Sequence, residues 1–598
     1  MSAVYPTPAR CELLGNMVYP DKGISIGVSS KHRAATENII VKAFRSARFA
    51  VHWHEEDDTG YPVRIGDVQQ GFGQIPDITG LGDEAYAVSV DETGVSVVAN
   101  SDRAVLYGLS SLTQLISSAG IECGTITDYP LFAHRGVVEG FFGRPYSDKD
   151  RLDLIEYIGR LKMNVYLYGP KDDPYHRVRW REMYDRQRMA TFAELVDRAE
   201  SVGVEFGWAA GPGFTVRYSD ERDVAAMVDK FGQMASVGIR LFAIFYDDIF
   251  EHMQYAEDRS EFDSLAQAQA AFTRRVWKRL KESWPDARML VCPTEYRGDA
   301  DSDYVVELGA SVPDEIPLMW TGQEVCSRSI TTEQARTVAE HMGRPPAYWD
   351  NYPVNDASMV FDLHVGPLQG RDATLGKTCW GILFNPMNLA EASKIPLFTA
   401  ADYTWNSAAY EPETSWRAAL EHVDGYCAAE WERVFDYMRG SCLDDSDSCR
   451  LDTLLAEYNE RVRAGNQPDM GPISSYFADL AAALDRVATA AGVNMKLARE
   501  VGPWVNRLRG LQTVAAEIVS VLSMATGEKP LDMDRVRHMR GRVMREIDSL
   551  RDAFLPHVAK RSVESLALRA VCVSEEFMRG DAAAAMSIME KPIEYVKW

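Results

Sequence analysis

Residues 241–253 read LFAIFYDDIFEHM, in which six apolar or aromatic residues lead directly into two adjacent aspartates, Asp247 and Asp248. A continuous apolar run of this length is typical of a strand that is buried on both faces, as in a parallel sheet. Two adjacent like charges at the end of such a strand indicate that the carboxylates have a function at this position.

Short apolar runs on both sides of this stretch repeat the pattern. Each run is followed by polar residues and then by a helical stretch, and the runs begin roughly 30–45 residues apart, which is the length of one strand–helix unit. Eight such units predict a (β/α)8 barrel, whose chemistry lies at the C-terminal ends of the strands. The runs cover residues 135–140, 163–169, 204–211, 239–246, 288–293, 316–320, 346–350 and 379–384.

Different patterns flank the barrel. Before it, AYAVSV and VSVVAN alternate around a turn-rich DETG, which predicts a hairpin, and Ser101 is a good N-cap for the helix that follows. After it, apolar stripes at helical spacing predict a bundle core, with an oligomer surface as the alternative. The fold class is therefore α/β: a small α+β domain (1–130), a central (β/α)8 TIM-type barrel (131–420) and an α-helical bundle domain (421–598).

Composition narrows the class of partner. The chain has 64 basic and 88 acidic residues and a net charge of −24, which disfavours nucleic acid and anionic membranes. Its nine cysteines form no CxxC pair, so we expect reduced thiols. The N-terminal segment does not have the pattern of a secretion signal, and no apolar run approaches the roughly 20 residues that span a bilayer. We expect a cytoplasmic enzyme.

The polar residues that follow the eight runs should converge on one rim of the barrel. They are aromatic, amide and carboxylate side chains with one lysine, a combination that suits a sugar, because rings stack on its C–H faces and polar groups bind its hydroxyls. The glycines match neither a P-loop nor a GxGxxG motif, and the His52–His54 pair lies in the N-terminal region. We expect no metal and no cofactor. The rim set includes Gly140, Lys171, Asp247, Asp248, Cys292, Tyr296, Trp349, Asn351, Asp356 and Asn385.

Several long motifs follow one another in order along the presumed barrel. They read RGVVEGFFGRPYS, KMNVYLYGPKDDPYHRVRWRE, FYDDI, CPTEY, MWTG, YWDNYPVND and NPMNLAEASKIPLFTAADYTWN. Together they resemble glycoside hydrolase family eighty-four, the O-GlcNAcase-like β-N-acetylglucosaminidases. The region before them is also similar to the small domain that precedes the barrel in that family.

The resemblance implies roles for individual residues. Asp247 and Asp248 match the family's catalytic pair. Phe142 departs from the family's usual tyrosine, so one hydroxyl is missing from the rim. The positions that match substrate-binding residues are Gly140, Lys171, Cys292, Tyr296, Trp349, Asn351, Asp356 and Asn385.

Two touching aspartates suit an unusual glycosidase mechanism. Most glycosidases place carboxylates on either side of the scissile bond, about 5–9.5 Å apart, which neighbouring residues reach only awkwardly. A 2-acetamido sugar supplies its own nucleophile, the acetamide oxygen. We then expect Asp247 to orient the acetamide, Asp248 to serve as general acid and base, and the outcome to be retention through an oxazoline intermediate.

The sequence leaves alternatives open. The expected activity is that of a retaining exo-β-N-acetylglucosaminidase, acting on a β-GlcNAc-bearing glycan, glycoprotein or oligosaccharide. A hyaluronan- or mucin-type glycan hydrolase and a catalytically inactive glycan-binding barrel are the other interpretations. The natural aglycone is left open, and so is a homodimer formed through the helical tail. A second pair, Asp172 and Asp173, is expected to cap the next helix and to pair with Arg177 or Arg179.

Overall fold

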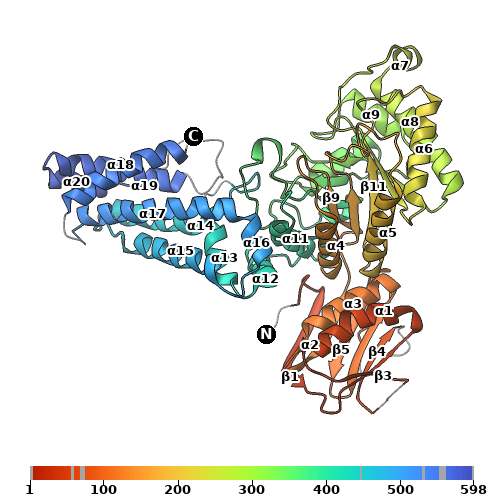
Figure 1. Cartoon of the computed structure of the whole chain (residues 1–598), viewed down its shortest axis with the longest axis horizontal. Helices are drawn as coiled ribbons and strands as arrows, with labels where there is room; N and C mark the ends of the chain where they lie inside the picture. Colours follow the sequence, from red (N-terminus) through yellow and green to blue (C-terminus); the bar gives the residue numbers. More distant parts are fainter. Residues whose placement is uncertain are drawn as a thin grey trace. The chain divides into compact units, whose positions relative to one another are not determined.

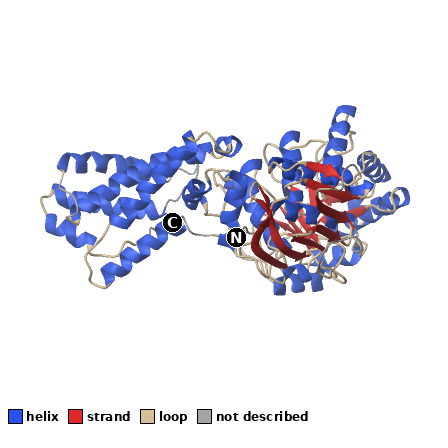
Figure 2. Cartoon of the chain, turned by 90° about the horizontal axis from the view of Figure 1, so that it is seen from below, coloured by secondary structure: helices blue, strands red, loops and turns tan. Residues whose placement is uncertain are grey.

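The computed structural model describes residues 4–55, 59–66, 75–444, 448–527, 532–550 and 561–594. Contacts within the chain divide it into two units. The first comprises Met1–Tyr352, Leu368–Pro386 and Leu397–Pro412, and the second comprises Pro353–Pro367, Met387–Pro396 and Glu413–Trp598. The first unit holds the N-terminal domain and the barrel, and the second holds the helical bundle (Figures 1 and 2).

The N-terminal domain is a sheet with helices packed against it. The predicted hairpin is β5 and β6, closed by the pair Asp91 and Gly94, and α3 begins after Ser101, whose side chain accepts a hydrogen bond from the Ala104 amide. The strands lie in the order β1-β8-β5-β6-β4-β2-β3, with β7 paired to β8. Their bounds are β1 Arg10–Val18, β2 Ile24–Val28, β3 Val51–Trp53, β4 Tyr61–Gly66, β5 Tyr86–Asp91, β6 Gly94–Ala99, β7 Ile116–Ser117 and β8 Gly120–Asp128, and the helices are α1 Arg33–Thr36, α2 Lys42–Ser46 and α3 Asp102–Gln114.

The barrel has eight parallel strands, and the predicted fold class is confirmed. The strands run in the order β13-β12-β11-β10-β9-β16-β15-β14, and a parallel bridge between Val291 and Leu318 joins the two ends. The eight apolar runs of the sequence correspond to these eight strands. Their bounds are β9 His134–Glu139, β10 Val165–Tyr168, β11 Glu205–Ala210, β12 Leu241–Phe245, β13 Arg288–Cys292, β14 Met319–Trp320, β15 Ala347–Asp350 and β16 Gly381–Phe384.

Helices follow the strands and begin at well-defined caps. Side chains of Ser147, Asp185, Asp220, Ser264, Ser302 and Thr331 each accept a hydrogen bond from a backbone amide in the first turn of the helix that follows. Capping of this kind fixes where each helix starts, and therefore how long the preceding loop on the rim can be. The helices are α4 Asp148–Arg160, α5 Arg186–Ser201, α6 Glu221–Ala235, α7 Ala256–Glu261, α8 Leu265–Ser283, α9 Asp303–Ser311, α10 Thr332–Met342 and α11 Ala390–Trp405.

A buried ion pair joins the N-terminal domain to the barrel. Lys162, which follows α4, has its Nζ 3.0 Å from Asp128 Oδ2 at the end of β8, and both side chains are fully buried. Trp405 Nε1 donates to the other oxygen of Asp128 at 2.8 Å, and Lys162 also donates to the Tyr86 hydroxyl at 2.7 Å. Burial raises the pKa of Tyr86, so its hydroxyl remains a hydrogen-bond donor. One carboxylate thus holds together three separate segments of the first unit.

The second unit is helical throughout its longer described segments. The predicted stripe Ile473, Phe477, Leu480, Leu484 and Val487 is buried on α15, and Trp504, Leu508, Leu511 and Ile518 are buried on α17. The helices are α12 Pro412–Asp424, α13 Ala428–Phe435, α14 Cys449–Arg463, α15 Gly471–Thr489, α16 Met495–Glu500, α17 Gly502–Ala525, α18 Met533–Leu550, α19 Arg561–Met578 and α20 Ala582–Met589. The ends of the domains predicted as 1–130 and 421–598 include residues outside the described ranges, and these boundaries stay predictions.

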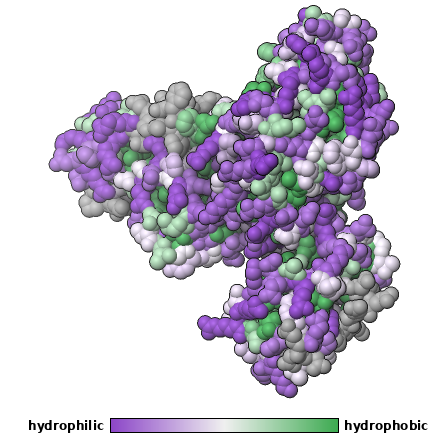
Figure 3. All heavy atoms as spheres, turned by 45° about the vertical axis from the view of Figure 1, so that its right-hand side comes forward, coloured by the Kyte–Doolittle hydropathy of each residue, from purple (hydrophilic) through white to green (hydrophobic). Residues whose placement is uncertain are grey.

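Helix α17 is long and apolar enough to cross a membrane by length and composition alone. Of its 18-residue apolar window, however, 61% is buried inside the protein, and the helix packs against α15, α18 and α19. The core helix of a bundle has the same properties. Figure 3 shows a face of the molecule on which hydrophilic residues predominate and hydrophobic residues are scattered among them, as is normal for a protein surface in water.

Replacing Lys162 with methionine should destabilise the first unit by about 3–5 kcal/mol, because Asp128 would remain as a buried charge without its counter-ion. Urea unfolding measures the effect. Combining Lys162→Met with Asp128→Asn should cost less than the sum of the two single changes. The control is Lys149→Met on the exposed face of α4, expected to change stability by less than about 0.5 kcal/mol. Additive effects at Lys162 and Asp128 would contradict the proposed coupling.

Candidate functional site

The two adjacent aspartates lie at the C-terminal end of β12. Asp247 is 8% exposed, and the Asp248 side chain is 34% exposed. In a regular strand successive side chains point to opposite faces, but Asp248 has a φ of +55°. This left-handed conformation, which aspartate tolerates better than most residues, turns the backbone between the two side chains. As a result, both carboxylates approach the same lysine.

That lysine is Lys171, which follows β10. Its Nζ donates a short hydrogen bond to Asp247 Oδ2 and lies 4.0 Å from Asp248 Oδ2. The side chain is 4% exposed, and its Nζ lies 5.5 Å from the Phe245 ring centroid and 5.4 Å from that of Trp349. Because little water surrounds this buried ammonium, its attraction to the nearby carboxylates is screened only weakly.

Within the described part of the chain, one oxygen at this site has no hydrogen-bond partner. Among the described residues, Asp247 Oδ1 is buried and accepts no hydrogen bond, although Oδ2 is held by Lys171. A buried carboxylate oxygen without a donor is costly, and such atoms are uncommon in folded proteins. The site therefore offers an acceptor that a ligand N–H or O–H would satisfy.

Two side chains from the end of β13 complete this part of the site. Tyr296 donates its hydroxyl to Asp248 Oδ1 at 3.0 Å, and burial together with the charge of Asp248 raises its pKa, so it remains a phenol. Cys292 is 2% exposed, and burial raises the pKa of its thiol well above the usual range. The thiol is protonated and forms part of an apolar wall rather than acting as a nucleophile.

The ends of β15 and β16 form an amide network beside these residues. Asn351 Oδ1 accepts from Trp349 Nε1 and from Asn385 Nδ2, both at 2.9 Å. Asn385 Oδ1 in turn accepts from the Gly140 amide at 3.2 Å. The network holds the Trp349 indole, whose centroid lies 5.0 Å from that of Phe245, at a fixed angle.

Gly140 is required by the close approach of this indole. A Cβ atom at position 140 would lie 2.2 Å from Trp349 Cζ2 and 2.5 Å from Cη2. Such distances are far inside van der Waals contact, so the ring occupies the space that any other residue's side chain would need. Gly140 therefore acts on the site through Trp349 and through its amide.

Nine of the ten predicted site residues lie in the first unit, at the strand ends described above. Asp356 instead belongs to the second unit, where it immediately precedes the short 3-10 helix Ala357–Met359 and its carbonyl accepts from the Met359 amide at 2.9 Å. Its predicted role in binding a sugar stays a prediction.

Other polar groups at the strand ends are engaged in structure. Glu139 accepts from Arg151 Nε and Nη2, both at 2.8 Å, and from the Tyr166 hydroxyl at 2.7 Å. Asp173 accepts from the hydroxyls of Tyr168 and Tyr184 at 2.7 and 2.6 Å.

The prediction that the second aspartate pair binds Arg177 or Arg179 was wrong for Asp173. Arg179 pairs with Glu182 instead, and Arg177 donates to the carbonyl of Asp248 at 3.2 Å. The prediction that this pair caps the next helix was also wrong, because Asp185 caps α5. The hydroxyl partners of Asp173 are Tyr168 on β10 and Tyr184 further along the chain. The sequence argument considered only nearby charged residues and therefore did not find them.

His176 is engaged in structural contacts rather than in the site. It is fully buried, its ring packs edge-on to Phe245 at 5.8 Å, and its Nδ1 lies 2.6 Å from the Ala209 carbonyl oxygen. Burial lowers the pKa of His176 to about 4. The imidazole is therefore neutral near pH 7, with Nδ1–H donating to Ala209.

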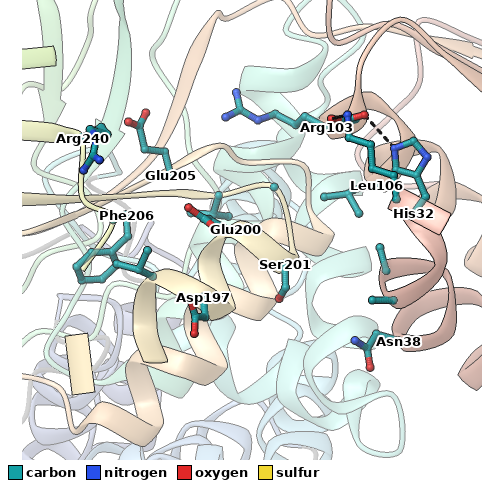
Figure 4. Close-up of a pocket in the computed structure, with 18 of the residues that line it drawn as sticks. His32, Asn38, Arg103, Leu106, Asp197, Glu200, Ser201, Glu205, Phe206 and Arg240 are labelled. Atoms are coloured by element: carbon teal, nitrogen blue, oxygen red, sulfur yellow. Dashed lines mark hydrogen bonds and ion pairs between the residues drawn. The ribbon is translucent and has the colours of Figure 1, made fainter. Parts of the chain in front are cut away.

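A large cavity lies elsewhere, between α3 of the N-terminal domain and α5 of the barrel (Figure 4). It has a volume of about 910 Å³ and reaches Glu205 and Arg288, the first residues of β11 and β13. These two pair with each other, and His32 pairs with Asp102. The cavity lies at the N-terminal ends of the strands, whereas barrel chemistry occurs at the opposite ends. Among the described residues, no three His, Cys, Asp or Glu side chains are grouped to hold a metal ion.

Comparison with protein families gives two matches. Residues 135–436 match the family model described as beta-N-acetylglucosaminidase, and residues 1–129 match the model of glycosyl hydrolase family 20, domain 2. The "Protein O-GlcNAcase" of Rattus norvegicus and that of Mus musculus are each 36% identical over 276 residues, covering 45% of this chain. The aligned region spans 29% of the length of these curated relatives.

Similar solved structures cover more of the chain. An O-GlcNAc hydrolase variant from Thermobaculum terrenum is 30% identical, with a TM-score of 0.70, over 75% of this chain and 97% of its own. The structure of CpGH84B is 25% identical, with a TM-score of 0.81, over 95% and 100% of the two chains. That of CpGH84D, at 23% identity and a TM-score of 0.82, covers 96% of this chain and 100% of its own and supports the fold.

Replacing Gly140 with alanine should lower the rate of aryl β-N-acetylglucosaminide hydrolysis by about 100-fold, because the new Cβ would displace the Trp349 indole and a shift of about 1 Å near a reacting group costs that much. Steady-state kinetics with a nitrophenyl glycoside measure the effect, and circular dichroism checks that the fold is retained. The control is Gly510→Ala on α17, where a Cβ meets no atom within 4 Å. A folded Gly140→Ala enzyme with unchanged kinetics would contradict the role given to Trp349.

Proposed function

The chain belongs to the beta-N-acetylglucosaminidase family of glycoside hydrolases, and on this premise we propose that it removes terminal β-linked GlcNAc with retention of configuration. The proposed mechanism is substrate-assisted hydrolysis through an oxazoline. The observation that carries the proposal is the pair Asp247 and Asp248. They share Lys171, while one buried oxygen of Asp247 has no donor among the residues that the structure describes.

The placement of the aspartates favours a nucleophile supplied by the substrate. Neighbouring residues have Cα atoms about 3.8 Å apart, and both carboxylates here face one ammonium, so they approach a sugar from the same side. A conventional retaining enzyme needs a second carboxylate on the opposite face of the ring. Three other carboxylates at strand ends are already engaged: Glu139 by Arg151, Asp173 by two tyrosines, and Asp350 by Arg371.

The first step forms the ring of the intermediate. The free oxygen of Asp247 accepts the acetamide N–H of the sugar and stabilises the positive charge that develops there, while Lys171 fixes the other oxygen. The acetamide oxygen then attacks the anomeric carbon. As the bond from that carbon to the leaving oxygen breaks, Asp248 donates its proton to the leaving oxygen.

The second step reverses the roles. Asp248, now a carboxylate, removes a proton from water, and the resulting oxygen attacks the anomeric carbon and opens the oxazoline. Two inversions at one carbon give overall retention. Tyr296 donates to Asp248 Oδ1. In the proposed mechanism it also binds the acetamide oxygen, while Cys292 and Trp349 supply apolar surface for the acetyl methyl group.

Progressive fluorination of the N-acetyl group should lower the rate steeply. Each fluorine reduces the basicity of the acetamide oxygen, which is the nucleophile in the proposed mechanism. The measurement is kcat/KM for nitrophenyl glycosides with acetyl, fluoroacetyl, difluoroacetyl and trifluoroacetyl groups. A flat series would refute substrate assistance and favour a two-carboxylate hydrolase. If the unmodified glycoside is not hydrolysed at all, the chain is an inactive glycan-binding barrel.

Replacing Asp248 with alanine should have an effect that depends on the leaving group. With a poor leaving group such as a methyl or peptidyl oxygen, kcat/KM should fall by about 10²–10⁴-fold, the usual contribution of a general acid. With a dinitrophenyl group, which leaves without a proton, the loss in the first step should be much smaller. The control is Asp172→Ala, the exposed member of the second aspartate pair. An equal fall in kcat/KM for both substrates would show that Asp248 is not the general acid.

A further inference from the structure

A row of four aromatic side chains and one arginine extends along the rim beside the proposed acid. Phe142, Arg177, Phe214, Phe250 and His252, here called the rim ladder, come from the loops after β9, β10, β11 and β12 in turn. Phe142 and Phe250 are 39% and 52% exposed. Large apolar side chains that stay exposed together at the edge of a site mark a binding surface more often than those scattered singly.

The members of the rim ladder contact one another in sequence. The Arg177 guanidinium carbon lies 5.5 Å from the Phe142 ring centroid and 4.8 Å from that of Phe214. The Phe214 and Phe250 rings meet edge to face at 6.0 Å, and Phe250 lies 5.5 Å from the His252 ring. The guanidinium is thus held between two aromatic rings, as in cation–π pairs.

The loops that carry the rim ladder are fixed against each other. A Cβ at Gly213 would lie 2.5 Å from Ile249 Cγ2, so the loops after β11 and β12 are in direct contact. Gln254 Nε2 also donates to the Gly213 carbonyl at 3.2 Å. Because the surface is already formed, a ligand that binds there need not order it first.

Arg177 connects the rim ladder to the backbone of Asp248. It donates to the Asp248 carbonyl at 3.2 Å, and among the described residues this is its one hydrogen bond. A guanidinium has five N–H donors, so others remain for a ligand. Because Asp248 is the proposed proton donor to the leaving oxygen, the rim ladder lies next to the residue that the leaving group approaches.

The chemistry of the rim ladder suits a polypeptide better than a second sugar. A sugar buried against a protein needs hydrogen-bond partners for its hydroxyls, because unpaired polar groups are costly. Phenylalanine, unlike tyrosine or tryptophan, has no hydrogen-bonding group on its ring. Three of the five members of the rim ladder are phenylalanine.

We infer that the rim ladder is an aglycone site that selects an acidic polypeptide, with its aromatic faces packing on the chain next to the glycosylated Ser or Thr. Arg177 then binds a carboxylate within one or two residues of that position. This inference rests on the proposed function and adds the class of leaving group to it. One cation in an apolar setting attracts a carboxylate more strongly than an amide of the same shape.

The test compares matched substrates on one enzyme. Two β-GlcNAc-serine peptides differ only in having Asp or Asn at the residue next to the serine, and nitrophenyl β-GlcNAc and the β-1,4-linked GlcNAc disaccharide serve as references. The wild type should prefer the Asp peptide by about 3–10-fold in kcat/KM, as expected for a partly exposed ion pair. It should hydrolyse the disaccharide less efficiently than either peptide.

Two variants assign the preference to residues. Arg177→Met should bring the Asp-to-Asn ratio close to one, and Phe250→Ala should lower kcat/KM for both peptides relative to the nitrophenyl glycoside. Taking ratios within each variant removes any loss from poorer folding or a displaced Asp248. The control is Leu14→Ala, a 70% exposed side chain on β1, expected to leave every ratio unchanged.

The outcomes separate this inference from the proposed function. A wild type without an Asp preference, or one whose preference survives in Arg177→Met, overturns the role of Arg177. Hydrolysis of the disaccharide at least as efficiently as of the peptides overturns the polypeptide assignment. Failure to hydrolyse even the nitrophenyl glycoside would instead refute the proposed function itself.

Discussion

The site depends on the contact between Lys171 and Asp247 in surroundings that are mostly apolar. Neither group would be stable alone at that depth, because an unpaired charge in the interior costs far more than a surface charge. The contact also orients Asp247: one oxygen is held by the ammonium, and the other is buried with no donor among the described residues, so a ligand could bind it. The remaining features, which are the turned Asp248, the phenol of Tyr296 and the indole of Trp349, are arranged around this fixed point.

The scaffold keeps that point in place by satisfying polar groups elsewhere. At the strand ends, Glu139 and Asp173 are tied to Arg151 and to tyrosine hydroxyls, which leaves them no part in the chemistry but stabilises the loops. On the other side of the barrel, the Lys162–Asp128 pair attaches the N-terminal domain. Under the proposed mechanism, the buried carboxylates of Glu139 and Asp247 therefore have different roles, and the number of hydrogen-bond partners distinguishes them.

The barrel was predictable from the sequence because parallel strands buried on both faces read as apolar runs, and because the residue after each run must lie on the rim. The same argument gave Lys171, Cys292 and Asn385. It did not give the partners of Asp173, which pair across loops, or the place of Arg177 beside Asp248, since contacts between loops leave no periodic signal. The argument also could not predict that Asp356 belongs to the second unit, because short segments within the barrel region of the sequence belong to that unit. The family resemblance supplied roles that spacing alone does not contain.

The positive φ of Asp248 has a consequence for how this position tolerates change. Glutamate would keep the acid, but its longer side chain would overshoot Tyr296, and it adopts the left-handed region less readily than aspartate. Asparagine matches both the size of aspartate and its backbone preference, yet lacks the acidic proton that the proposed mechanism requires. Replacing Asp248 with glutamate, although chemically conservative, is therefore expected to disturb the local structure. Replacing it with asparagine is the change suited to capturing an intact glycoside in a crystal.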